Sequence, residues 1–137
     1  EVMVVDASAV LAILLREDDA QLYARRLATA TDAVISPVNY WEVLIRMTGL
    51  FGAPGRVIAD RYLSEASITI MPIGSDIAKM AVTASERYGR GTPAKLNLGD
   101  TFAYALAKEE GAPLLFKGDD FTKTDIVNAL TGQPGPA

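Results

Sequence analysis

Any hydrolytic chemistry in this sequence must rest on carboxylates. The chain has no histidine, which removes the usual general base, the usual catalytic triad and the commonest transition-metal ligand. It has no cysteine either, which excludes thiolate zinc sites and cysteine nucleophiles. Carboxylates and water favour hard cations such as Mg²⁺ or Mn²⁺. We therefore expect a hydrolytic site in this chain to be a cluster of acids around a divalent cation.

Four positions could bring acids to one site, because each follows a predicted strand or opens a predicted helix. They are Asp6, Glu42, Asp100 and the pair Asp119–Asp120. Each position also has a local explanation. Asp6 and Asp100 could each cap a helix. Glu42 stands four residues before Arg46, the spacing of a surface ion pair, and the aspartate pair could form a turn after Gly118.

The apolar surroundings of these acids favour a shared site. Asp6 lies between two apolar runs, Glu42 lies within the segment Trp41–Ile45, and Asp100 precedes an apolar stretch with few cations nearby. A buried carboxylate is unfavourable unless it is paired or bound to a metal. One divalent cation would neutralise several acids together.

Short apolar strands alternate with amphipathic helices along the chain. Strands are predicted over residues 2–5, 34–35, 68–72, 114–116 and, as a last short segment, 126–127. Helices are predicted from residue 7 and over 19–30, 37–50, 56–65, 75–88 and 99–110. This alternation predicts an α/β fold with a parallel sheet and helices on both faces. The helix over 37–50 is expected to bury Val38, Trp41, Leu44, Ile45 and Thr48.

Length and composition predict one domain. Half of the 137 residues are hydrophobic, enough for a sizeable core, and we expect a single domain over 1–137 with a disordered tail over about 132–137. The formal charge of −4 does not favour binding to nucleic acid through overall charge. The apolar runs are shorter than a membrane span and no secretion signal precedes the first of them, which predicts a cytoplasmic protein with no membrane partner.

The chain contains the segments VVDASAVLAILL, SPVNYWEVL, LNLGDTFAYALAKEEGAPLLFKGDDF and TKTDI. In residues, order and approximate spacing they closely resemble the PIN-domain ribonucleases, specifically the VapC toxins of bacterial toxin–antitoxin pairs. The resemblance covers nearly the whole chain. It implies a three-layer α/β/α PIN domain with a parallel sheet of about five strands. It also implies hydrolysis of RNA phosphodiester bonds that depends on Mg²⁺ or Mn²⁺.

The resemblance further implies roles for individual residues. The four acids of the family match Asp6, Glu42, Asp100 and Asp119 in this sequence. Asp120 competes for the fourth position, because the family varies in that loop. Ser8 matches a hydroxyl that orients the neighbouring carboxylates. Metal held by Asp6 and Asp100 would polarise the scissile phosphate and lower the pKa of a bound water, and either one or two ions are compatible with the sequence.

Partners are implied as well. The substrate would be RNA, such as tRNA or rRNA, with Lys117 and Lys95 as candidate contacts to its backbone. A VapB-type antitoxin would lie in an apolar groove formed by the helices that carry residues 11–15, 41–45 and 58–63. The family also implies a homodimer or a toxin–antitoxin hetero-oligomer.

Two alternatives stay within the same fold, namely a PIN nuclease of RNA processing and a non-catalytic PIN binding module. The presence of all four acids argues against the second. The sequence disfavours two other folds. A receiver domain needs paired acids after the first strand and an aspartate after the central one, and a haloacid-dehalogenase-type phosphatase needs Asp-x-Asp where this chain has Ser8.

Overall fold

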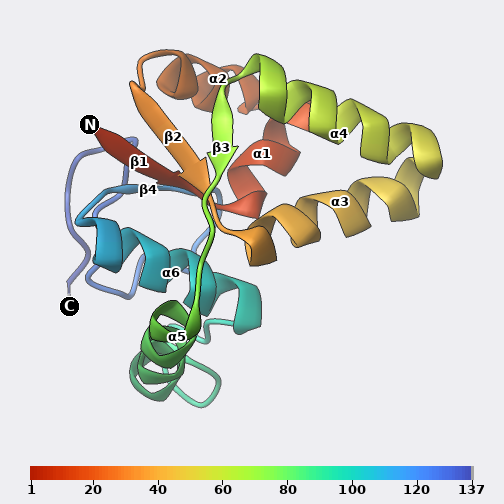
Figure 1. Ribbon diagram of the computed structural model, residues 1–137. Coiled ribbons are helices and arrows are strands. Elements are labelled where there is room, and N and C mark those ends of the chain that lie inside the picture. Colours follow the sequence, from red (N-terminus) through yellow and green to blue (C-terminus); the bar gives the residue numbers. More distant parts are fainter. Residues whose placement is uncertain (137) are drawn as a thin grey trace.

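A four-stranded parallel sheet forms the middle layer of the protein (Figure 1). The structure is a computed structural model, which describes residues 1–136. The strands are β1 (Val2–Val5), β2 (Asp32–Ile35), β3 (Ile68–Ile70) and β4 (Leu114–Leu115), and they lie side by side in the order β3-β2-β1-β4. Their β-branched and apolar side chains suit a sheet that is covered on both faces.

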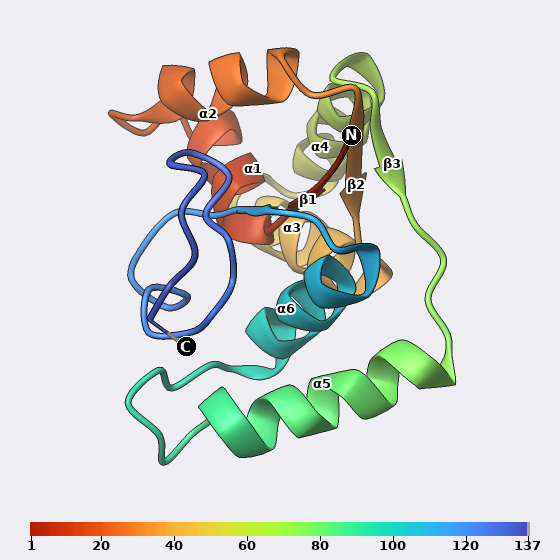
Figure 2. The same ribbon diagram turned by 90° about the vertical axis from the view of Figure 1, so that its left-hand side faces the viewer.

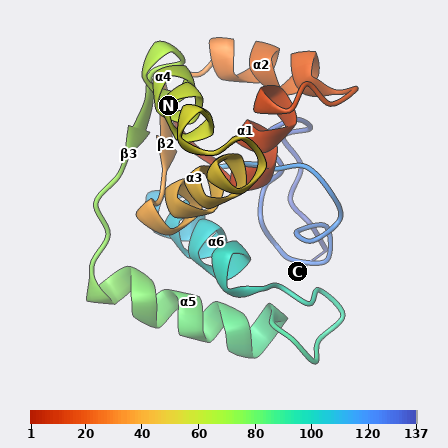
Figure 3. The same cartoon turned by 90° about the vertical axis from the view of Figure 1, so that its right-hand side faces the viewer.

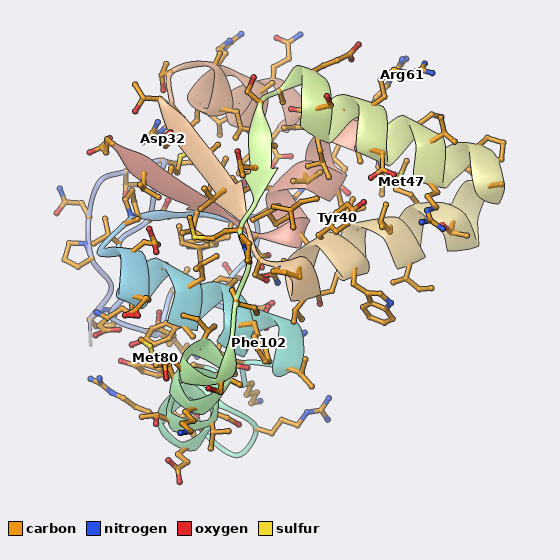
Figure 4. All side chains as sticks on the ribbon, viewed as in Figure 1. Asp32, Tyr40, Met47, Arg61, Met80 and Phe102 are labelled. Atoms are coloured by element: carbon orange, nitrogen blue, oxygen red, sulfur yellow. The ribbon has the colours of Figure 1, made fainter. Side chains whose placement is uncertain are left out.

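Helices cover both faces of this sheet. They are α1 (Ala7–Leu14), α2 (Ala20–Ala28), α3 (Pro37–Phe51), α4 (Ala53–Glu65), α5 (Ser75–Tyr88) and α6 (Leu98–Glu110). Met3 and Val5 point into the core beneath α1 to α4, whereas Val4 points into the core beneath α5 and α6. Met80 and Phe102 lie where α5 and α6 face each other (Figure 4). The three-layer α/β/α arrangement confirms the predicted fold class.

The sheet has one strand fewer than expected within the described residues. In place of a fifth strand over 126–127 there are two isolated bridges, a parallel one between Leu114 and Asn128 and an antiparallel one between Val127 and Pro134. The amide of Leu114 donates to the carbonyl oxygen of Val127, and the amide of Ala129 donates back to Leu114. The segment therefore runs beside β4 without extending the ladder.

The C-terminal segment folds back beside these bridges (Figure 2). Gly132 donates to the carbonyl oxygen of Asn128 at 2.7 Å, and Gly135 donates to Ile126 at 3.1 Å. The side chain of Asn128 accepts from the amide of Leu130 at 2.8 Å, which closes the turn that returns the chain. The disorder expected over about 132–137 stays a prediction, and residue 137 lies outside the described residues.

Helix α3 buries a different face from the one expected. Asn39, Val43 and Met47 are buried, whereas Trp41 is 60% exposed and Ile45 is 51% exposed. Apolar residues occur on more than one face of the helix, so their spacing alone does not decide which face is buried. Helix α4 packs against the Met47 face, and Figure 3 shows the two helices side by side. Figure 4 shows the Met47 side chain between them.

A glycine allows this close packing of α3 and α4. A Cβ atom on Gly55 would lie 2.2 Å from the carbonyl oxygen of Met47.

Within residues 1–136, no helix has both the length and the apolar composition needed to cross a bilayer.

Candidate active site

Acids from four segments line a hollow of about 360 Å³ at the carboxyl end of the sheet. Asp6 follows β1 directly, Glu42 lies in the second turn of α3, and Asp100 lies in the first turn of α6. Asp120 reaches the same hollow from the loop after β4. The parallel strands bring these positions together, because their carboxyl ends share one edge of the sheet.

The fourth acid of the hollow is Asp120, the alternative in the sequence, and not Asp119. Asp120 lines the hollow, and its charge contributes to a raised pKa at both Asp6 and Asp100, after the larger effect of burial. The carbonyl oxygen of Asp119 instead accepts from the amide and the hydroxyl of Thr122 in a turn. Successive residues of a turn point in different directions, and the sequence does not indicate which of the two aspartates points inward.

Asp6 caps α1 with only one of its carboxylate oxygens. Its Oδ2 accepts from the amide of Ser8 at 3.0 Å and from the Ser8 hydroxyl at 2.5 Å. The Ser8 hydroxyl in turn accepts from the backbone amide of Lys117 at 2.9 Å. The other oxygen, Oδ1, is buried and has no hydrogen-bond partner. A buried carboxylate oxygen without a hydrogen-bond partner raises the free energy of the folded state. Helix capping uses only Oδ2 and does not explain why Oδ1 is buried.

Asp100 and Asn97 form a capping box at the start of α6. The Asp100 amide donates to Asn97 Oδ1 at 2.8 Å, and the Asn97 amide donates to Asp100 Oδ2 at 3.0 Å. Burial, together with the charges of Asp6, Asp120 and Glu42, raises the pKa of Asp100 to about 7. Without a nearby cation, this carboxyl group is therefore partly protonated at neutral pH.

A buried asparagine holds Glu42 in place. The Nδ2 group of Asn39 donates to Glu42 Oε1 at 2.8 Å and to the carbonyl oxygen of Gly99 at 3.0 Å. The Ser36 hydroxyl donates to Asn39 Oδ1 at 2.6 Å, which fixes the orientation of the amide. Burial raises the pKa of Glu42, and the charge of Asp6 raises it further.

Sequence reasoning missed Asn39 and Gly99. The one available signal concerns Asn39, a polar side chain on a largely apolar helix that stands one turn before Glu42. No ion pair joins Glu42 to Arg46 in the described part of the chain, so the surface-pair explanation of Glu42 is not supported.

The donor set of the hollow fits a hard divalent cation. Among residues 1–136, no group of three or more acidic side chains is placed to hold one metal ion. Mg²⁺, however, is commonly bound by one or two carboxylates and several waters. The orphaned Oδ1 of Asp6 and the raised pKa values of Asp6 and Asp100 are both consistent with a cation at these two acids, because its charge would stabilise their ionised forms.

The basic residues predicted to contact RNA lie outside the hollow. None of the residues described as lining it is a lysine or an arginine. The ammonium group of Lys117 already contacts Glu17, and it lies 3.0 Å from Asp19. Lys95 is exposed in the loop before α6. Glu17 and Asp19 therefore already neutralise much of the positive charge that Lys117 would offer to RNA.

Comparisons with known proteins agree on the family. Residues 3–127 match the PIN domain. The chain is 42% identical over 131 residues to Ribonuclease VapC42 of Mycobacterium tuberculosis, an alignment that covers 94% of this chain and 100% of the relative. It is 43% identical over 126 residues to Ribonuclease VapC of Mycolicibacterium smegmatis, covering 91% of this chain and 98% of the relative.

Solved structures share the fold. VapC20 of M. tuberculosis, described as a sarcin-ricin loop cleaving toxin, superposes with a TM-score of 0.74 at 15% identity, covering 91% of this chain and 96% of its own. A toxin–antitoxin complex from Klebsiella pneumoniae superposes with a TM-score of 0.68 at 21% identity, covering 87% of this chain and 89% of its own. At these identities the likeness establishes the fold alone.

Proposed function

Because this chain belongs to the PIN-domain family, and within it to the VapC ribonucleases, we propose that it is a toxin endoribonuclease that hydrolyses RNA phosphodiester bonds with Mg²⁺ or Mn²⁺. One observation of this chain carries the proposal. The buried Oδ1 of Asp6 has no hydrogen-bond partner, and Asp6 lines a hollow together with three further acids. A divalent cation would satisfy this oxygen and neutralise the cluster.

Each acid has a proposed task. Asp6 and Asp100 hold the cation, which when bound polarises the scissile phosphate and lowers the pKa of a water molecule. Glu42, fixed by Asn39, and Asp120 orient water molecules in the hollow. Ser8 holds Asp6 so that Oδ2 is occupied and Oδ1 stays available.

A VapB-type antitoxin is the proposed protein partner. Four large apolar side chains near the turn between α3 and α4 are about half exposed, namely Leu50, Phe51, Val57 and Ile58. An apolar surface of this kind is suited to an amphipathic segment of another chain. One structural neighbour is described as a toxin–antitoxin complex, which supports such a partner. A homodimer and a toxin–antitoxin hetero-oligomer both remain part of the proposal.

The nature of the RNA substrate separates a toxin from an RNA-processing nuclease. Both would use the same acids, and tRNA and rRNA are the proposed targets. A non-catalytic binding module is disfavoured, because it would gain nothing from four clustered acids whose mutual repulsion is unfavourable.

The direct test is RNA cleavage by the purified chain, free of antitoxin, with Mg²⁺, Mn²⁺ or EDTA. We expect cleavage with either metal and none with EDTA. Asp100→Asn should abolish cleavage while keeping the fold, because asparagine can still accept the capping hydrogen bond from Asn97. Cleavage that survives both EDTA and this substitution would contradict the proposal.

A further inference from the structure

The hollow has an apolar side as well as an acidic one. Leu11, Trp41 and Ile45 line it together with the acids. Trp41 and Ile45 are four residues apart on α3 and therefore lie on the same face of the helix. Both side chains are more than half exposed, so a ligand in the hollow could cover a large aromatic surface that the fold itself leaves open.

The exposure of Trp41 is a consequence of how α3 packs. The helix uses its Asn39, Val43 and Met47 face against the core and α4, which turns the indole ring away from both. Glu42, the next residue, reaches into the acidic side of the hollow. Trp41 thus borders the position that the scissile phosphate would occupy near the acids.

The charges of the hollow limit what can attract RNA there. The lining residues include four acids and, among those that the structure describes, no lysine or arginine. Lys117, three residues before Asp120, already forms salt bridges with Glu17 and Asp19. The lining residues described therefore offer no basic side chain to a phosphate, whereas they offer the Trp41 ring to a base. Unpaired bases stack readily on aromatic side chains.

We propose that Trp41, with Ile45 beside it, is a stacking platform for an unpaired base of the RNA substrate, next to the phosphate that is cleaved. This inference rests on the ribonuclease function proposed above. A base within a duplex is already stacked on both sides, so the platform selects single-stranded segments. Every base has a π face, and the platform is therefore tolerant of sequence.

The tryptophan fluorescence of the protein, excited selectively over that of its tyrosines, reports on this platform alone, since Trp41 is the single tryptophan in the sequence. The Asp100→Asn protein with Mg²⁺ would be titrated with a short oligoadenylate and with an abasic ribose–phosphate oligomer of the same length. Stacking predicts quenching by the oligoadenylate and little change with the abasic oligomer. Equal effects of the two oligomers would overturn the proposal, as would quenching by a purified antitoxin but not by RNA.

Substitutions of Trp41 test the same contact without fluorescence. In the Asp100→Asn background, Trp41→Ala should weaken RNA binding by about tenfold, whereas Trp41→Phe should keep most of the affinity. In the otherwise native enzyme, Trp41→Ala should raise KM and leave kcat nearly unchanged. Val82→Ala is the matched control, because Val82 is also 60% exposed but lies on α5, outside the hollow.

Affinity of Trp41→Ala equal to that of the unsubstituted protein would contradict the platform. A native chain that does not cleave RNA with Mg²⁺ would contradict the proposed function instead. In that case the comparison between the oligoadenylate and the abasic oligomer still decides whether bases stack on Trp41.

Discussion

Gly99 and Glu42 are in such close contact that any side chain at position 99 would displace the Glu42 carboxylate. A Cβ atom on Gly99 would lie 2.1 Å from Oε2 of Glu42, far inside van der Waals contact. Gly99 is the second residue of α6, immediately before Asp100. This glycine therefore leaves the space that the Glu42 carboxylate occupies beside the first turn of α6.

Gly99→Ala should reduce RNA cleavage by at least about tenfold, because the methyl group displaces the Glu42 carboxylate from its contact with Asn39. Alanine is a good helix former, so the melting temperature should change little. The measurement is kcat together with thermal unfolding. Gly49→Ala is the matched control, since a Cβ there meets nothing within 4 Å and kcat should stay unchanged. Native kcat in Gly99→Ala would show that the position of Glu42 does not matter.

Asp120→Asn should lower cleavage by about a hundredfold, whereas Asp119→Asn should leave it within about twofold. The two substitutions remove the same charge from neighbouring residues, but only Asp120 lines the hollow. Cleavage rates at saturating Mg²⁺ compare them directly. The reverse ranking would restore Asp119 as the fourth acid.

Asp100→Asn should stabilise the metal-free protein above neutral pH. The pKa of Asp100 is raised to about 7 in the folded chain, whereas an unfolded aspartate titrates near 4, so the folded state binds the extra proton between these values. The stability of the native chain therefore falls as pH rises from about 4 to 7. Asparagine removes this loss, which amounts to a few kcal/mol at most.

Unfolding with urea in EDTA at pH 5 and at pH 8 measures the effect. The advantage of Asp100→Asn should be larger at pH 8 than at pH 5. An advantage that is equal at both pH values would mean that Asp100 does not titrate in the folded range inferred from its surroundings.

Mg²⁺ should raise the melting temperature of the native chain, because it binds the folded site and not the unfolded chain. The shift should be larger at pH 8 than at pH 5, since Asp6 and Asp100 must be ionised to bind it. Asp6→Asn should remove the shift, whereas Asp119→Asn should keep it. A shift of the same size in Asp6→Asn would place the bound Mg²⁺ elsewhere.

The sequence predicts those features that depend on local pattern. The six helices and the first four strands have clear apolar spacing, and their residues Asp6 and Asp100 follow a strand or open a helix in the structure as expected. The buried face of α3 does not follow from local pattern, because Trp41 and Val43 are equally apolar and only packing against α4 decides between them. The contact between Asn39 and Gly99 spans 60 residues, and no local pattern encodes it.

Asp6 is both the N-cap of α1 and one of the four acids that line the hollow. Oδ2 accepts from the amide of Ser8, whereas Oδ1 is buried without a hydrogen-bond partner. Opening of the first turn of α1 breaks the hydrogen bond from the Ser8 amide to Asp6 Oδ2. The rate at which the Ser8 amide exchanges its hydrogen with solvent therefore reports how firmly Asp6 is held. A ligand that binds Asp6 slows this exchange without contacting Ser8.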